Sequence, residues 1–583
     1  MNYFELILFL PLIITLFLLA FSYPFKWLHL KEEIVKHLFD MSAFISIVFS
    51  LVGILFSFEQ ETVLFNFIPL KVDLSNLLIY FFSSIMLFLV SKFSFKYIHK
   101  ELGFYKFFLN LILFWLGQFL FVFADDYLVL FSGWEFIGIS SLFLISFYSF
   151  RESPIKNSLY VMSFYKIADI ILITCLILLG HKEILDLHPN YLQIVYSGII
   201  VAGLVKSAAF PFSSWLPRSM EGPTTSSAIY YVALSVNTGV ILIYKFLPQL
   251  NVYDLCNGIL FICGTLTVIY STFVSRVQTD AKTSLGYSSL IQIGIILIEC
   301  SFGLTTLPIV HLFLNSFYKL YQFIKSPSLL TSYHTMIGEN QSLFIRGGKH
   351  FESFVPEGLR KSLYFYSLNG FYLDHFYLRI GRFFSILSSY VEQLFFPLIN
   401  KTSKHSYRTM FWWAYYILLA FLISAGAIDI SNNYFDIIPF VILLVSISLL
   451  FEKNQNAFIA MLMIYKVLES FIVHGVHSHE PYKWVAIIIL GLFLFLLIFS
   501  EKRKIRSKSM KHLTGTLLIL LMLYFTNLPF LLQSLVNEHI IEAFLIRDKV
   551  VDLVFYSFAN TFLNIALYLF IFNKIYFKEI IDE

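Results

Sequence analysis

Apolar runs of about 20 residues follow one another along most of the chain, and each is long enough to cross a bilayer as a helix. Eleven runs lie in the first 325 residues, near 3–22, 41–57, 74–95, 104–123, 127–148, 158–180, 191–212, 224–246, 255–275, 284–300 and 304–325. Six more lie near 411–428, 434–451, 456–474, 483–500, 511–533 and 549–573. The pattern predicts an all-α polytopic membrane protein with about 17 transmembrane helices.

The runs divide the chain into four parts. Residues 1–103 are N-terminal transmembrane helices, and 104–330 form a core that contains most of the charges buried in apolar runs. Residues 331–410 are polar and then aromatic and amphipathic, which predicts a cytoplasmic or membrane-surface segment. Residues 411–583 form a second, C-terminal set of transmembrane helices.

Basic residues alternate between the loops and so predict the orientation. Loops after odd-numbered helices hold Lys and Arg, whereas one loop after an even-numbered helix holds the pair Asp125–Asp126. Because basic loops stay in the cytoplasm, we expect the N-terminus outside and the C-terminus inside. The N-terminal run has no basic start and no small-residue cleavage site, so we interpret it as a helix rather than a signal peptide.

Composition agrees with residence in the bilayer. The chain is 58% hydrophobic and only 13% charged, whereas soluble domains have about 25% charged residues. The net charge of +4 comes from loop residues and does not indicate nucleic-acid binding. The four cysteines lie in or beside apolar runs with no metal-binding spacing, and we predict no metal and no cofactor.

Lys206 is the most informative residue, because it lies inside an apolar run shortly before Pro211. A cation at bilayer depth costs roughly 2.5–3.5 kcal/mol on insertion scales. Broken helices are tolerated at that depth where they are buried in protein or line a wet cavity. The pattern therefore predicts a broken seventh helix beside a functional lysine.

Other predicted helices also contain ionisable groups. Glu135 lies in the fifth, Lys166 and Asp169 share one face of the sixth, and His311 and Lys319 share one face of the eleventh. Two interpretations remain open: the charges are ion pairs that hold the bundle together, or they form a proton relay. A pair such as Glu135–Lys206 serves both, because a desolvated lysine that loses its carboxylate partner releases its proton.

Four sequence motifs now permit a comparison with a known family. They are GWEFIGISSLFLISFY, KSAAFPFSSWLPRSMEGPTTSSA, TDAKTSLGYSSLIQIG and HLFLNSFYKLYQFIKSPS, in this order. Together they resemble the antiporter-like subunits, over about residues 60–330. This family includes NuoL-type subunits of respiratory complex I, Mrp-type sodium/proton antiporter subunits and DabB-type subunits of inorganic-carbon transporters. The resemblance identifies residues 104–330 as an antiporter-like, proton-translocating core.

The resemblance implies roles for particular residues. The helix 5 glutamate and the lysine of broken helix 7 form the coupled pair of the family, here Glu135 and Lys206. Lys282 and Lys319 match further family lysines. Two positions depart from the family, because Tyr231 replaces a histidine on helix 8 and Asn315 replaces a second histidine on helix 11. Tyr and Asn bind water without titrating near neutral pH.

The C-terminal third departs further. The broken helix that usually carries the exit lysine in the family does not follow residue 330. A weakly similar segment occurs much later, LYFTNLPFLLQSLVNEHIIEAF, and it places Glu538 in the equivalent position. Lys466 and Glu469 share a helical face and form either a second proton site or, as we favour, a structural pair. His474, His477 and His479 lie at a helix end, where we do not predict a metal.

The chain has no GxGxxG fingerprint, no Walker loop and no cysteine cluster, so it has no redox or hydrolytic site of its own. The resemblance implies proton translocation as one subunit of a larger complex, similar to NADH:quinone oxidoreductase or a cation/proton antiporter, in a bacterial-type inner membrane. Its partners are then other membrane subunits and a cytoplasmic redox or carbonic-anhydrase-like protein. One alternative is the DabB-type subunit of a bicarbonate or CO2 transporter, and another is a structural scaffold.

Overall fold

The structure is a computed structural model of the 583-residue chain. It describes residues 3–22, 31–56, 60–64, 68–101, 103–180, 189–228, 235–278, 280–339 and 356–383, with the single residues Ile386, Val445, Tyr556 and Ala559. The chain forms two compact units, residues 1–375 and 376–583. All elements named below belong to the first unit.

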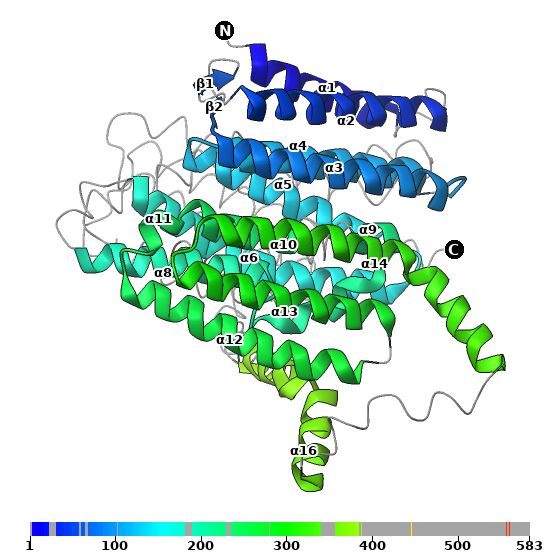
Figure 1. Cartoon of the computed structure of the whole chain (residues 1–583), viewed down its shortest axis with the longest axis vertical. Coiled ribbons are helices and arrows are strands. Elements are labelled where there is room, and N and C mark those ends of the chain that lie inside the picture. Colours follow the sequence, from blue (N-terminus) through cyan, green and yellow to red (C-terminus); the bar gives the residue numbers. More distant parts are fainter. Residues whose placement is uncertain are drawn as a thin grey trace, which may run out of the picture. The chain divides into compact units, whose positions relative to one another are not determined.

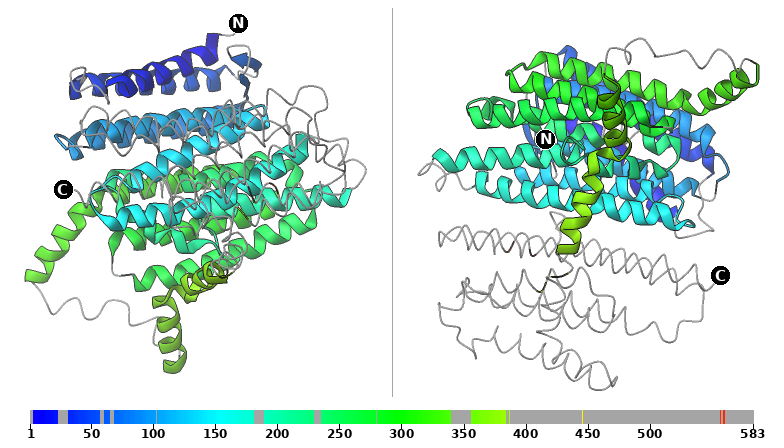
Figure 2. Two further views of the ribbon diagram at one scale, coloured as in Figure 1. Left: turned by 180° about the vertical axis from the view of Figure 1, so that it is seen from behind. Right: turned by 90° about the horizontal axis from the view of Figure 1, so that it is seen from below.

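The long helices of the first unit lie side by side with roughly parallel axes (Figures 1 and 2). They are α1 (Tyr3–Ser22), α2 (Glu32–Leu55), α3 (Leu74–Tyr97), α4 (Phe104–Phe123), α5 (Tyr127–Ile145), α6 (Glu152–Gly180), α8 (Pro189–Lys206), α10 (Ser235–Lys245), α12 (Asp254–Val277), α13 (Ala281–Ser301) and α14 (Thr306–Glu339). Short helices complete the unit: η2 (Ser213–Trp215), η3 (Pro217–Glu221), α9 (Thr224–Ala228), α11 (Leu247–Leu250), α16 (Glu357–Leu368) and η6 (Gly370–Tyr372).

The structure confirms the predicted all-α membrane fold. Within the described part of the chain, seven helices are long and apolar enough to cross a membrane, namely α2, α3, α4, α5, α6, α12 and α13. Helix α4 begins and ends where the apolar run predicted, whereas α2 begins at Glu32, nine residues before its apolar run. The last six predicted helices lie outside the described residues, so the total of about 17 stays a prediction.

A small β-hairpin was not predicted. Strand β1 (Gln60–Leu64) pairs antiparallel with β2 (Ile68–Val72), and Thr62 lies opposite Leu70. Leu70 also forms a bridge to Ala124, so the hairpin is joined to the α4–α5 connection. Asp73 follows directly and caps α3, because its side chain accepts the backbone N–H of Asn76 at 2.7 Å.

The two ends of the first unit differ in charge. Because neighbouring helices run in opposite directions, the α2–α3, α4–α5 and α13–α14 connections share one end. We call it the acidic end, since Asp73, Asp125 and Asp126 lie there. The α3–α4, α5–α6 and α12–α13 connections share the other end, the basic end, which includes Lys100 and Arg151.

Helix α8 breaks after Lys206, as predicted for the seventh transmembrane helix. Ala208 takes a positive φ of 55°, and the chain continues through the 3₁₀ turns η2 and η3. Trp215, at the end of η2, is completely buried. The non-helical backbone thus lies within protein. This is required because the bilayer core has no water to form hydrogen bonds with free N–H and carbonyl groups.

The backbone groups freed by the break find new partners. The Trp215 indole N–H donates to the Val205 carbonyl at 3.1 Å, and the Ser213 hydroxyl donates to the Ala208 carbonyl at 2.8 Å. The Phe210 N–H donates to Thr267 Oγ1 on α12 at 2.9 Å. These bonds stabilise the break because a buried polar group without a partner costs about 1–3 kcal/mol.

Glycines let the broken helix approach its neighbours. A Cβ added to Gly239 on α10 would collide with the Gly203 carbonyl on α8 and with the Ser207 hydroxyl. On α4 and α5, Gly117 and Gly133 meet in the same way. Small residues at such crossings allow close backbone packing in membrane bundles, and here they bring α10 close to the end of α8 and α5 close to α4.

The segment after α16 contacts the far side of the break. Asp374 forms an ion pair with Arg218 of η3 at 3.0 Å, and the Arg218 guanidinium lies 4.0 Å from the centre of the Tyr160 ring. Phe371 packs against Tyr270 of α12 with ring centres 5.8 Å apart. Part of the predicted 331–410 segment is therefore attached to the bundle near the broken helix.

We predict that Thr267→Val destabilises the protein by about 1–3 kcal/mol, because it leaves the buried Phe210 N–H without its acceptor. Thr265→Val is the matched control, since Thr265 lies on the same helix and bonds only to the local Phe261 carbonyl. Thermal unfolding of the purified full-length protein in detergent measures the difference. Equal melting temperatures for the two variants would show that this bond does not stabilise the break.

Candidate functional site

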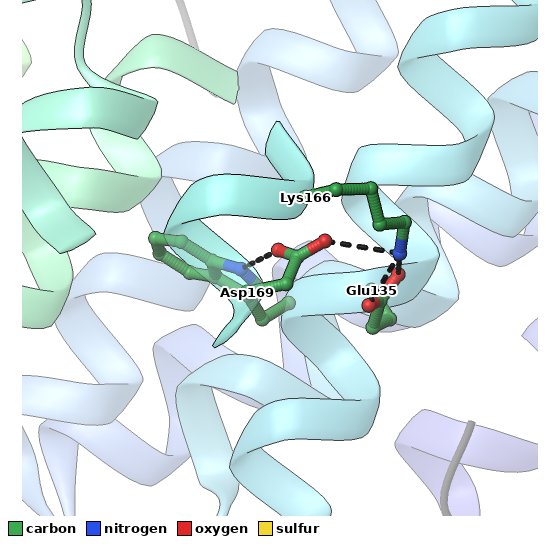
Figure 3. Close-up of polar contacts among 4 residues, drawn as sticks. Glu135, Lys166 and Asp169 are labelled. Atoms are coloured by element: carbon green, nitrogen blue, oxygen red, sulfur yellow. Dashed lines mark hydrogen bonds and ion pairs between the residues drawn. The ribbon is translucent and has the colours of Figure 1, made fainter. Parts of the chain in front are cut away.

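A cluster of buried charged side chains lies between α5, α6 and the end of α8. Lys166 of α6 is placed between two carboxylates (Figure 3), with its Nζ 2.7 and 2.9 Å from the two oxygens of Glu135 on α5. The same Nζ is 3.0 Å from Oδ2 of Asp169, one turn along α6. All three residues are at most 6% exposed, so the ion pairs are screened little by solvent.

The indole of Trp134 connects this triad to Lys206. Its N–H donates to Oδ1 of Asp169 at 2.7 Å, and the Lys206 ammonium lies 4.6 Å from its ring centre. Lys206 also lies 4.1 Å from the ring centre of Tyr165. The aromatic faces attract the ammonium through their negative quadrupoles, which partly compensates for its lost hydration.

Lys206 is the last residue of α8 and is 1% exposed. Within the part of the chain that the structure describes, no carboxylate lies within ion-pair distance of its ammonium. A Cβ added to Gly138 of α5 would lie 2.9 Å from its Nζ. The missing side chain at Gly138 therefore leaves the space that the ammonium occupies.

The structure corrects one expected pairing. Glu135 pairs directly with Lys166 rather than with Lys206, because Lys166 is on the adjacent helix and reaches both carboxylate oxygens. Lys206 instead lies against Trp134 and Tyr165. The cluster contains two acids and two lysines, so Lys206 balances the charge of the triad without contacting a carboxylate.

A second polar group of residues lies where α13 packs against α14. Lys319 of α14 donates to the Ser288 hydroxyl of α13. His311 lies 2.8 Å from Oε1 of Glu299 and 3.0 Å from Oε1 of Gln292, through its two ring nitrogens. On the neighbouring face of α14, Asn237 of α10 donates to the Ser316 hydroxyl at 2.8 Å.

The remaining predicted site residues lie partly within and partly outside the described part of the chain. Lys282 lies in the first turn of α13 at the basic end, next to the capping residue Asp280. Asn315 is buried on α14 between His311 and Lys319. Tyr231 and Glu538 lie outside the described residues, as do Lys466, Glu469, His474, His477 and His479, and their roles stay predictions.

Two charged residues were missed from sequence. Glu299 lies in the last turn of α13, where its apolar run ends. Lys245 lies at the end of α10 and donates to the Phe121 carbonyl at 2.9 Å. Both lie at the edges of apolar runs, where charge is common, and no periodic signal marked them.

Lys245 also lines a cavity of about 430 Å³ at the acidic end. The three aspartates Asp73, Asp125 and Asp126 contribute to its wall, and Thr305 contributes from the α13–α14 connection. The cavity is large and polar enough to hold several waters. Among the described side chains, no group of three or more His, Cys, Asp or Glu is arranged to hold a metal ion.

Comparison with known proteins shows similarity over the region that contains the buried charges. Residues 124–345 match the family model described as NADH:quinone oxidoreductase/Mrp antiporter, TM, and this range contains both clusters. The match supports the resemblance to antiporter-like subunits that was drawn from the motifs of this region.

Individual relatives agree with this assignment. The chain is 34% identical over 221 residues to NADH-ubiquinone oxidoreductase chain 5 of Paramecium tetraurelia, covering 34% of this chain and 39% of the relative. It is 27% identical over 322 residues to the same subunit of Rhinoceros unicornis, covering 52% and 53%. The chain thus spans about half or less of the length of these relatives.

One solved structure has a similar fold. A chain in the structure of the Mrp complex from Dietzia sp. DQ12-45-1b aligns with a TM-score of 0.51, covering 88% of this chain and 75% of that chain. The aligned residues are 15% identical, so the likeness concerns the fold.

We predict that Lys166→Gln destabilises the protein by about 3–5 kcal/mol, because it leaves Glu135 and Asp169 buried without their shared cation. The double variant Lys166→Gln/Glu135→Gln removes one charge of each sign and should recover most of this loss. Thermal unfolding of the full-length protein in detergent tests both. A double variant as unstable as the single one would mean that the pair contributes through packing rather than charge.

Proposed function

We propose that this protein is a proton-translocating subunit of a multi-subunit membrane complex. The observation that supports the proposal most is the position of Lys206, buried at the end of a broken helix beside the Glu135–Lys166–Asp169 triad. A lysine ammonium that faces two rings and no nearby described carboxylate is the least compensated charge of the cluster. It is therefore the group best placed to gain and lose a proton.

The proposed switch uses the shared position of Lys166. While Lys166 holds both carboxylates, Lys206 is stabilised mainly by Trp134 and Tyr165, and loss of its proton is favoured by burial. When the Glu135 carboxylate moves toward Lys206, the lysine is held charged, and Asp169 still compensates Lys166. A small rearrangement of one carboxylate thus changes the proton affinity of Lys206 without leaving a buried carboxylate unpaired.

The second cluster provides the continuation of the path. Lys319 is 6% exposed, as a relay lysine buried within the bundle requires. Asn315, His311 and the hydroxyl of Ser288 offer hydrogen-bonding groups beside it along the α13–α14 interface. We propose that water connects Lys206 to Lys319 through the region of Tyr231, which takes the place of a titrating histidine.

Partners and location are part of the proposal. The relatives are named as one chain of NADH-ubiquinone oxidoreductase, and the similar fold occurs in an Mrp complex. We propose that this chain likewise assembles with other membrane subunits, and that a cytoplasmic redox or carbonic-anhydrase-like partner supplies the driving reaction. The loop charges support an orientation with the basic end and C-terminus cytoplasmic and the N-terminus outside, and we propose that the membrane is of the bacterial inner type.

We predict that Lys206→Arg lowers proton transport by about 100-fold or more, because arginine does not release its proton in proteins and so removes a positioned transfer group. The tagged full complex is reconstituted in liposomes, and uptake is followed with a pH-sensitive dye. Lys92→Arg is the matched control, since Lys92 forms a partly exposed ion pair with Asp40. Normal transport in Lys206→Arg would exclude lysine deprotonation from the mechanism.

We also predict that Gly138→Ala slows transport about tenfold or more while every charge is retained. The added methyl group must displace the Lys206 ammonium, which lies 2.9 Å from its position, and misplacement of a transfer group is costly. Gly258→Ala on α12 is the control, because no atom lies within 4 Å of its added Cβ. Equal transport by the two variants would show that the exact position of Lys206 is unimportant.

A further inference from the structure

Glu299 and His311 form a dyad, and the proposed path so far includes only its histidine. Glu299 lies in the last turn of α13, and His311 lies in the second turn of α14, after the short connection at the acidic end. Their side chains are 14% and 22% exposed and 2.8 Å apart. The dyad is thus largely buried but lies close to one surface of the bundle.

Both ring nitrogens of His311 face oxygen atoms. Nδ1 lies 2.8 Å from the Glu299 carboxylate, and Nε2 lies 3.0 Å from Oε1 of Gln292. With the Gln292 amide oriented as in the structure, its oxygen can only accept a hydrogen bond. The imidazole therefore donates from Nε2, and the proton between Nδ1 and Oε1 belongs either to His311 or to Glu299.

This arrangement defines a proton that moves over a short distance. Transfer from Nδ1 to Oε1 breaks one N–H bond, forms one O–H bond, and converts imidazolium and carboxylate into neutral imidazole and carboxylic acid. The transfer leaves the net charge of the dyad unchanged, so it costs little in a medium that penalises buried net charge.

Glu299 has a further unused acceptor. Its second oxygen, Oε2, is buried and has no hydrogen-bond partner among the described residues. Buried carboxylate oxygens are normally satisfied, and each exception needs an explanation. We interpret Oε2 as the atom to which a proton or a water molecule binds during transport.

The dyad lies at the end of a continuous row of polar groups. Ser288, Gln292 and Glu299 follow one another at spacings of four and seven residues, which places them on one face of α13. Ser288 contacts Lys319, and Gln292 and Glu299 contact His311 further toward the acidic end. The row therefore runs from the buried lysine to the α13–α14 connection.

The connection between α13 and α14 borders a cavity at the acidic end. Thr305, in the connection between α13 and α14, lines the cavity of about 430 Å³. The three aspartates in the cavity wall outnumber its two lysines, Lys71 and Lys245, so the cavity attracts cations, including hydronium. The charged groups on this side of the bundle are thus Lys319 along the row and, in the cavity wall, the three aspartates with Lys71 and Lys245.

We propose that Glu299 and His311 are the terminal proton-exchange site of the path through Lys319, between the interior of the bundle and the acidic end. This inference rests on the proposed function. The proton passes from His311 to Glu299 and then to water, which restores the carboxylate. A second proton, carried by water from the side of Lys319 to the free Nδ1 of His311, restores the imidazolium.

The test measures proton flux through the reconstituted full complex for three variants. Glu299→Gln, which cannot exchange a proton at this position, should lower the flux about tenfold or more. Glu299→Asp keeps the carboxyl group but withdraws it by one methylene, and should retain more flux than Glu299→Gln. Glu101→Gln, an exposed carboxylate at the basic end, should transport normally.

The outcomes separate this inference from the proposed function. If Lys206→Arg stops transport while Glu299→Gln transports at the normal rate, the terminal site is wrong and the proposed function stands. If Lys206→Arg also transports normally, the proposed function itself fails.

A second measurement keeps the proposal testable if the Glu299→Gln complex fails to assemble. Infrared difference spectra of the full complex, taken across a pH titration, should contain a carboxylic-acid C=O band that shifts in Glu299→Asp and is absent from any assembled Glu299→Gln complex. A merely structural glutamate would leave these spectra unchanged. Spectra identical to those of the parent protein in Glu299→Asp would overturn the proposal.

Discussion

The structure depends on the compensation of charges that have been removed from water. An isolated ion in a low-dielectric interior is costly enough that proteins pair it or neutralise it. Here Lys166 satisfies two carboxylates at once, and the indole of Trp134 satisfies the remaining oxygen of Asp169. The packing of α5 against α6 is consequently determined by electrostatics as well as by apolar contact.

The same constraint shapes the break in α8. A helix that ends inside a bundle leaves carbonyl and N–H groups without helical partners. Here Trp215, Ser213 and Thr267 form hydrogen bonds with such groups. The break places Lys206 against ring faces at the end of the helix, where side chains from α5 and α6 converge. The helical break and the charge cluster are therefore parts of one arrangement.

Much of the fold was predictable because the signals were long and local. The run that became α4 is apolar throughout, and Pro211 beside Lys206 was enough to indicate the broken helix. The start of α2 was missed because its first turns contain polar residues such as Glu32, which hydropathy excludes. The hairpin was missed because its strands are five residues each and depend on pairing with each other.

The site was only partly predictable for a different reason. Periodicity placed Lys166 and Asp169 on one face, but the partner of Glu135 depends on how α5 and α6 rotate against each other, which no local pattern encodes. Glu299 carried no signal because an acid at a helix end is ordinary until the neighbouring His311 is seen.

Trp134 has a consequence for observation as well as for stability. Its indole N–H donates to the Asp169 carboxylate at 2.7 Å, and the Lys206 ammonium lies 4.6 Å from its ring centre, so a strong electric field acts on the indole. A change in charge on Lys206 alters that field directly and therefore shifts the wavelength of the Trp134 fluorescence emission. Trp134 is thus an intrinsic fluorescent reporter of the charge on Lys206.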